Sequence, residues 1–251
     1  MIHDLHTIVD WLQYNKLYLN FSKSNFMYIS KGNIHPQSLP LPLSNNQIKY
    51  SKCIKFLGLY IDEQLTWKTH ITNVKNKISP FVGIMCKLKH YISLKYLKLI
   101  YFTFIYTHLQ YLASIWSTAC DKDLNPLRIL QNKAVKYIHN LPYLEPTINL
   151  YRPKQLMDID RIYKYKICCY IFSVINKKKH SNANFTVNNN IYEHNTRQLN
   201  HLSLINIKSN YGKKSVYDQG IKIYNSLPTD LKNIQNLIKF KNKLKKHLLN
   251  I

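Results

Sequence analysis

The sequence predicts an α+β fold, in which a small β-hairpin unit precedes a mainly α-helical domain and a helical C-terminal tail. Short β-rich runs separated by loop residues occupy the first 65 residues, and apolar residues at helical spacing occupy most of the rest. The chain has 251 residues, 45% of them apolar, so it is long enough to bury a core. We expect four parts: residues 1–65, a helical domain at 66–176, a flexible linker at 177–200 and a basic helical segment at 201–251.

The first 65 residues are expected to form one helix and several short strands. Apolar residues at helical spacing predict an amphipathic helix that ends near Asn15. Leu17–Asn20 and Phe26–Ser30 have the composition of short strands, and Lys31–Asn46, with one glycine and three prolines, that of a loop. Ile54–Asp62 is β-rich. Alternation within it predicts that Leu57, Leu59 and Ile61 lie on one face.

Sustained helical periodicity begins after residue 65 and predicts four consecutive helices. Ser93, Asp121 and Asp158 stand where the N-caps of the second, third and fourth helices are expected. Four helices joined by short links form an α-helical domain. The apolar seam of the first helix follows spacings of four and three residues: Trp67, Ile71, Val74, Ile78, Phe81, Met85 and Leu88.

The last 75 residues change in character twice. Residues 177–200 carry three consecutive lysines, scattered asparagines and few large apolar side chains, which predicts a flexible linker. Helical spacing returns in residues 211–251, above a strongly basic face. The apolar stripe at the end of this segment consists of Leu237, Phe240, Leu244 and Leu248.

The composition is strongly basic, with 36 Lys+Arg against 12 Asp+Glu and a formal net charge of +24. All but four of the cations are lysines, and Lys, Ile, Asn and Tyr have A/T-rich codons, so codon drift accounts for part of the excess. The charge still attracts polyanions, with nucleic acid as the first expected partner and an anionic membrane as the second. The uncharged stretch Leu99–Trp116 contains Thr, His, Gln and Ser, so we expect a buried helix and no membrane partner.

No pattern in the sequence predicts a catalytic or metal site. Five glycines without a cluster exclude a Gly-rich nucleotide loop, and no serine lies in a nucleophile elbow. The five cysteines form no C-x-x-C pair and are expected to be free thiols. The paired acids are expected to be helix caps or a solvated loop pair: Asp62 with Glu63, Asp121 with Asp123, and Asp158 with Asp160.

Lysines interleaved with aromatic residues between positions 52 and 98 favour a binding function. Cations beside aromatic rings can follow a phosphate backbone without reading base sequence. The alternative, a solvated lysine-rich face enlarged by codon drift, is left open by this pattern. The lysines are Lys52, Lys55, Lys68, Lys75, Lys77, Lys87, Lys89, Lys95 and Lys98, and the aromatic residues are Tyr60, Trp67, Tyr91 and Tyr96.

Four motifs follow one another along the chain: WLxxNKLxLNxxKS at 11–24, KFLGLYIDxxLTWKxHI at 55–71, LQNKA at 130–134, and YNSLP at 224–228 followed by FK at 240–241. Their order resembles the reverse transcriptases of non-LTR retrotransposons, especially the jockey-like group. The first motif resembles the segment after the catalytic palm motif, and the second resembles the primer-grip hairpin that leads into the thumb. The third resembles a thumb helix and the fourth the C-terminal tail, so the resemblance spans nearly the whole chain.

The sequence departs from this family at several points. Ser24 stands where Thr is usual, Leu112 stands where Gly commonly follows a tyrosine, and Tyr224 stands where Trp is usual. The catalytic Asp-Asp turn of the family is expected before residue 1, together with the fingers, most of the palm and the endonuclease.

The resemblance implies a C-terminal fragment of an RNA-directed DNA polymerase, with a palm edge and primer grip in residues 1–65 and a thumb-like domain in residues 66–176. Its implied partners are an RNA template, a DNA primer and the missing upstream polymerase segment. The intact parent is expected to use Mg²⁺ and to work in the cytoplasm and nucleus, whereas the fragment is expected to hold no cofactor and to be inactive alone. No catalytic residue is expected, and the implied nucleic-acid-binding residues are Lys23, Lys55, Phe56, Leu57, Gly58, Trp67, Lys68 and His70.

Two alternatives stand beside the polymerase fragment. One is a stand-alone basic helical module that binds nucleic acid, and the other is a decayed reading frame without a cellular role. An upstream reading frame that encodes the Asp-Asp turn would separate the polymerase fragment from both.

Overall fold

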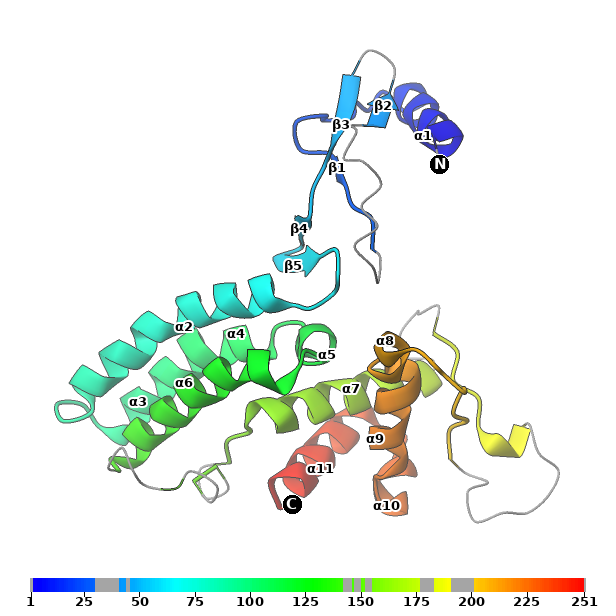
Figure 1. Ribbon diagram of the computed structural model, residues 1–251. Helices are drawn as coiled ribbons and strands as arrows, with labels where there is room; N and C mark the ends of the chain where they lie inside the picture. Colours follow the sequence, from blue (N-terminus) through cyan, green and yellow to red (C-terminus); the bar gives the residue numbers. More distant parts are fainter. Residues whose placement is uncertain are drawn as a thin grey trace. The chain divides into compact units, whose positions relative to one another are not determined.

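The computed structural model describes residues 2–29, 41–43, 46–141, 146, 150–151, 155–176, 183–190 and 201–250. They belong to two compact units, Met1–Asn73 and Val74–Ile251, so the division falls a little later than the predicted residue 65. Short strands lie in the first unit and helices make up most of the second (Figure 1), which confirms the predicted α+β class.

The first unit opens with α1 (Ile2–Tyr14), whose C-terminal end is a Schellman motif. Lys16 adopts a left-handed φ of 57°, and the amide of Leu17 donates to the carbonyl of Leu12 at 2.8 Å. These contacts end the helix where the apolar spacing predicted. The next residues, Leu17–Asn20, form no strand, in contrast to the prediction.

A three-stranded sheet with the order β1-β3-β2 follows (Figure 1). In it β3 (Asn46–Tyr50) pairs parallel with β1 (Asn25–Phe26) and antiparallel with β2 (Leu41–Leu43). Pro42 is tolerated because β2 is an edge strand, where a missing N–H breaks no ladder. The strand β2 falls inside the predicted loop Lys31–Asn46, most of which lies outside the described residues.

The helix α2 (Lys68–Leu88) begins in the first unit, continues into the second and confirms most of the predicted seam. Phe81 is only half-buried, and its neighbour Val82 is buried in its place. The shift arises because 3.6 residues per turn drift against a strict seven-residue pattern. Phe81 stacks instead on Phe104, with ring centroids 4.4 Å apart. The buried seam consists of Trp67, Ile71, Val74, Ile78, Val82 and Met85.

The second predicted helix is interrupted rather than continuous. The helix α3 (Leu94–Ile100) passes through a π-helical turn at Tyr101–Tyr106 into α4 (Thr107–Gln110). The helix α5 (Ala113–Trp116) starts only after Leu112, whose φ of 49° and ψ of 27° are left-handed. A left-handed residue breaks a right-handed helix. The apolar residues keep helical spacing on both sides of Leu112, so their spacing alone does not reveal the break.

The uncharged stretch Leu99–Trp116 packs into the protein, as predicted. Ile105, Leu109 and Trp116 are buried, and the indole N–H of Trp116 donates to the carbonyl of Tyr111 at 2.7 Å. Among the helices that the structure describes, none combines the length and apolar character that a membrane crossing requires.

Two long helices, α6 (Asp121–His139) and α7 (Ile159–Ile175), follow in the second unit (Figure 1). The helix α7 contacts α4, α5, α9 and α11, so it is covered on several sides. This position explains why its apolar residues are not confined to one stripe. Its buried side chains are Ile159, Ile162, Tyr163, Ile167, Cys168, Cys169, Ile171 and Phe172.

The ends of α6 and α7 show which predicted caps form. Asp158 caps α7 as predicted, because its Oδ1 accepts from the amide of Arg161 at 2.8 Å. Asp121 does not cap α6, since Cys120 holds the N-cap position and Asp121 is the first helical residue. Ser93 holds the N-cap position of α3 without a side-chain hydrogen bond.

The C-terminal helices pack on α7 and share its core. Phe172 of α7 stacks on Phe240 of α11, with ring centroids 4.0 Å apart and planes 12° from parallel. One buried cluster joins α7 to the C-terminal elements, which corrects the predicted division between residues 66–176 and 201–251. These elements are α8 (Asn210–Lys213), a π-helical turn at Val216–Gly220, α9 (Ile221–Asn225), α10 (Thr229–Lys232) and α11 (Leu237–Asn250).

Part of the predicted linker 177–200 packs against the same cluster. Ala183 is buried, and Val187 forms an isolated bridge with Leu202. The rings of Phe185 and Tyr217 lie 5.7 Å apart. Residues 183–190 therefore belong to the C-terminal core and do not link separate domains, while 177–182 and 191–200 lie outside the described residues.

Candidate nucleic-acid interface

Residues 55–58, all predicted to bind nucleic acid, lie at the tip of one β-hairpin. The strands β4 (Cys53–Phe56) and β5 (Leu59–Asp62) pair antiparallel, so Leu57 and Gly58 form a two-residue turn. Their φ angles of 47° and 82° are both positive, as a type I′ hairpin turn requires. Leu57 thus stands in the turn, and not on the strand face that it was predicted to share with Leu59 and Ile61.

The tip presents two exposed apolar side chains beside a lysine. Phe56 is 61% exposed and Leu57 is 73% exposed. Lys55 is also exposed, and its ammonium lies 5.6 Å from the ring centroid of Tyr60, its cross-strand partner. This cation–π contact holds the ammonium on one face of the hairpin. The tip can therefore offer a cation to a phosphate and apolar surface to a sugar or base.

The base of the hairpin is tied to the first turn of α2 by one carboxylate. The Oδ1 atom of Asp62 accepts from the amide of Thr66, and its Oδ2 atom accepts from the amide of Trp67, both at 2.8 Å. The amide of Tyr60 donates to Nδ1 of His70 at 3.4 Å. These contacts fix the direction in which the hairpin leaves the helix, which preorganises its tip.

Trp67 and His70, also predicted to bind nucleic acid, are buried. Trp67 is 9% exposed and His70 is 3% exposed. Both lie at the junction between the hairpin and α2, where the Trp67 amide donates to Asp62 and His70 accepts from the Tyr60 amide. Lys68 lies between them in sequence and is exposed, as a phosphate contact would require.

Lys23, the remaining predicted site residue, lies in a turn before β1. Its amide donates to the backbone carbonyl of Asn20 at 3.1 Å, and its side chain is exposed. Among the described residues it makes no contact with the hairpin, so the structure does not bring Lys23 together with Lys55.

The lysines of the second unit are mostly exposed. Lys75, Lys77, Lys87 and Lys95 are exposed, whereas Lys89 is half-buried with its ammonium 5.4 Å from the ring centroid of Tyr137. Two of the interleaved aromatic residues, Tyr91 and Tyr96, are also exposed. The helices α2 and α3 thus carry both the cations and the rings that phosphate-backbone binding uses.

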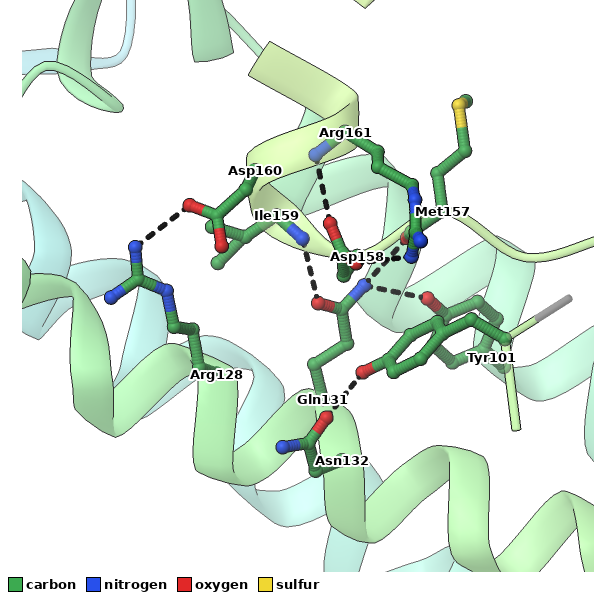
Figure 2. Close-up of polar contacts among 10 residues, drawn as sticks. Tyr101, Arg128, Gln131, Asn132, Met157, Asp158, Ile159, Asp160 and Arg161 are labelled. Carbon is green, nitrogen blue, oxygen red and sulfur yellow. Dashed lines mark hydrogen bonds and ion pairs between the residues drawn. The ribbon is translucent and has the colours of Figure 1, made fainter. Parts of the chain in front are cut away.

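The paired acids are engaged in helix caps and ion pairs. Arg128 forms an ion pair with Asp121 at 2.8 Å. Figure 2 shows its second pair, with Asp160 at 2.7 Å, and the bond between the guanidinium of Arg161 and Asp158. Among the described residues, no three His, Cys, Asp or Glu side chains come together as a metal site would require. These carboxylates therefore do not fit the two-metal group that the resemblance implies for a whole polymerase.

Gln131 of the LQNKA motif is a structural residue that sequence reasoning missed. It is fully buried, and its amide group donates to the Tyr101 hydroxyl and the Met157 carbonyl, both at 2.9 Å, and accepts from the amide of Ile159 at 3.0 Å (Figure 2). A single side chain thus joins α6 to the start of α7. The motif itself was the available signal, because a glutamine among inward-facing apolar positions predicts a satisfied buried amide.

Two curated proteins are similar to this chain. The probable RNA-directed DNA polymerase from transposon X-element of Drosophila melanogaster is 24% identical over 165 residues, which are 62% of this chain and 17% of that protein. The RNA-directed DNA polymerase from mobile element jockey of the same organism is 29% identical over 113 residues, which are 44% of this chain and 12% of that protein. No family model and no solved structure matches the chain.

The matched segment spans less than a fifth of the length of either relative. The names of both relatives agree with the family that the order of motifs resembles. The chain is therefore similar to RNA-directed DNA polymerases of non-LTR mobile elements of the jockey and X-element kind, which confirms the resemblance drawn from its motifs.

Proposed function

We propose that this chain is the primer-grip and thumb portion of a reverse transcriptase, and that it holds a template–primer duplex by the phosphates. The observation that supports this most is the β4–β5 hairpin, which exposes Lys55, Phe56 and Leu57 on a rigid turn. The core of the first unit does not bury these side chains. The tip suits a ligand that is both anionic and partly apolar, as the end of a primer strand is.

Each residue of the tip has a distinct task in this proposal. The ammonium of Lys55 pairs with a backbone phosphate, while Phe56 and Leu57 rest against the sugar and base at the primer's 3′ end. Gly58, with φ of 82°, lets the strand pass close to the backbone because no side chain stands there. Asp62 keeps the hairpin in position through its bonds to Thr66 and Trp67.

Catalysis belongs to other parts of a polymerase in this proposal. Among the described carboxylates, Asp158 and Asp160 come closest to the spacing of metal ligands. Asp158 caps α7, and Asp160 forms an ion pair with Arg128. We expect no template-dependent primer extension by the purified chain on homopolymer RNA with Mg²⁺ or Mn²⁺. Robust extension would show that the chain is a polymerase in its own right and not a holding portion.

Binding is tested by fluorescence anisotropy with a labelled RNA–DNA duplex over a salt series. The logarithm of the affinity is expected to fall linearly with the logarithm of the salt concentration, with a slope of about −0.9 per phosphate contact. Lys55→Glu is expected to weaken binding to all duplex sequences alike and to flatten the slope by about one contact. The control is Lys246→Glu, the same charge change at an exposed position of α11.

The two variants separate the proposed grip from codon drift. A clearly larger loss for Lys55→Glu than for Lys246→Glu supports a grip. Equal small losses would mean that the positive charge acts as a diffuse field, which contradicts the proposal. Absence of any duplex binding by the folded chain would favour a decayed reading frame.

A further inference from the structure

A groove on the second unit collects lysines that no part of the proposed grip uses. One cavity of about 660 Å³ is lined by the start of α6, the first turns of α7 and the segment from α8 to α9. A second cavity of about 490 Å³ shares Asp160, Lys164 and Lys222 with it and reaches α11. Because the two cavities have these residues in common, they form one continuous depression, which we call the α7 groove.

The carboxylates that line the α7 groove are already paired with cations of the protein. Each pair is short enough to be a hydrogen-bonded ion pair, but Arg128 serves two carboxylates, so the four acids outnumber the three cations paired with them by one. The pairs are Arg128 with Asp121 (2.8 Å) and Asp160 (2.7 Å), Arg161 with Asp158 (2.6 Å), and Lys222 with Asp218 (2.8 Å). Figure 2 shows the pairs Arg128–Asp160 and Arg161–Asp158.

Three further lysines line the groove, so its six lysines and arginines exceed its four carboxylates by two. Lys164, Lys213 and Lys214 line the larger cavity and are exposed, and none has an ionic partner in the part of the chain that the structure describes. Like charges gathered around a concave wall of low dielectric constant focus the field and raise the local concentration of anions. The groove is thus positive where solvent enters it.

We propose that the α7 groove binds the phosphodiester backbone of a single nucleic-acid strand, at a site separate from the β4–β5 hairpin. Cavities of several hundred Å³ match the size of small-ligand pockets and can take a few linked nucleotides. A duplex carries its phosphates on a broad convex surface, which does not enter such a depression. Lysine binds phosphate as a point charge without bidentate geometry, so the groove selects no base sequence.

The inference stands on the charges and shape of the groove and does not require the hairpin to be a primer grip. In a reverse transcriptase it would add a second contact, for a strand that lies outside the template–primer duplex. The hairpin and the groove therefore predict different ligand preferences, duplex for the first and single strand for the second.

The test is fluorescence anisotropy with a labelled 12-nucleotide single-stranded RNA and the full chain over a salt series. The double variant Lys164→Glu/Lys213→Glu is compared with Lys241→Glu/Lys246→Glu, which makes the same charge change at exposed positions of α11 outside both cavities. We expect about a tenfold greater loss of affinity for the groove variant at 0.1 M salt. We also expect a salt slope flatter by about 1.4, since single strands contribute about 0.7 per phosphate.

Equal losses for the two double variants, or an unchanged slope in the groove variant, would overturn the proposal. So would displacement of the RNA by inorganic phosphate at the same concentration of phosphate groups, because that would indicate a site for free phosphate. The neutral pair Lys164→Gln/Lys213→Gln, with its circular dichroism spectrum and melting temperature checked, should show a smaller loss in the same direction. Duplex binding by Lys55→Glu, measured beside single-strand binding by the groove variant, separates failure of the grip from failure of the groove.

Discussion

Leu57 is an unusual residue for the position that it holds. A left-handed φ of 47° costs an L-amino acid with a bulky side chain about 1–2 kcal/mol, and type I′ turns prefer Asn or Gly there. The side chain is also 73% exposed, so burial does not repay that strain. Residues held in strained backbone regions cluster at active sites and ligand clamps, which agrees with the proposed contact of Leu57 with a primer end.

The replacement Leu57→Asn should stabilise the protein and weaken its grip. We expect the free energy of unfolding to rise by about 1 kcal/mol, because Asn tolerates the left-handed region. Duplex affinity should fall several-fold as the apolar contact is lost. Urea denaturation followed by tryptophan fluorescence and duplex anisotropy measure the two effects. Leu57→Ala is the matched control, since it removes the side chain and keeps the strain, and gain of affinity in Leu57→Asn would contradict the assigned role.

At the scale of elements, the junction of α6 and α7 depends on Gln131. Its buried amide satisfies the Tyr101 hydroxyl, the Met157 carbonyl and the Ile159 amide. Each of these groups would lose a buried partner if Gln131 were replaced by an apolar residue. An unsatisfied buried polar group costs about 1–3 kcal/mol. Because Gln131 satisfies three such groups, its contribution to the free energy of unfolding should exceed that of one hydrogen bond.

Replacing Gln131 by Leu is therefore expected to lower the free energy of unfolding by about 3 kcal/mol. The exposed Asn125 on the same helix offers the control, because Asn125→Leu should change stability by no more than about 0.5 kcal/mol. Thermal melts and urea titrations of the two variants give the comparison. A similar small effect at both positions would mean that water replaces the Gln131 amide.

We expect the free energy of unfolding to depend on pH through His108, which lies on α4. Burial, and secondarily the charge of Lys77, lower the pKa of His108 below its ordinary value of 6.5. The folded state thus binds the proton less readily than the unfolded state. The contribution of neutral His108 to the free energy of unfolding is fully present above pH 6.5. It is lost as the pH falls from there through the lowered folded-state pKa.

His108→Gln should therefore reduce the loss of stability between pH 7 and pH 5. Urea midpoints of wild type and variant, measured in steps of half a pH unit, give the difference between the two curves. A parallel His6→Gln variant, on the exposed surface of α1, should follow the wild type. Superimposable curves for wild type and His108→Gln would rule out this source of pH dependence.

At the scale of the whole molecule, the second unit is one core built across a long stretch of chain. The helix α7 packs against α9 and α11, and the stacked pair Phe172 and Phe240 joins segments far apart in sequence. The buried cysteines Cys168 and Cys169 lie within that cluster. Burial raises the pKa of both thiols, that of Cys169 to about 11.

Thiol labelling should report on this core. At pH 8 the exposed Cys86 and Cys120 are expected to react quickly with iodoacetamide, whereas Cys168 and Cys169 are shielded and protonated. Their modification should begin only at urea concentrations that unfold the second unit. Peptide mapping by mass spectrometry identifies each site, and rapid labelling of Cys169 in native buffer would show that α11 does not stay packed on α7.

The sequence by itself determined what depends on near neighbours in the chain. The spacing of apolar residues predicted α1, α2, α6, α7 and α11, and the position of Asp158 predicted a helix cap that the structure contains. The order of motifs predicted the similarity to reverse transcriptases of mobile elements. These features are readable because helix periodicity and capping act over three or four residues.

Only the tertiary structure decided which residues face inward and which segments share a core. Trp67 and His70, which the resemblance implies as nucleic-acid-binding residues, are buried, whereas Leu57, another of these residues, is exposed in the hairpin turn. The residues after 200 were expected to form a separate segment and complete the core around α7. The physical reason is that burial depends on contacts between segments distant in sequence, which local periodicity does not encode, and the free energy of those contacts selects one packing among several that the same pattern allows.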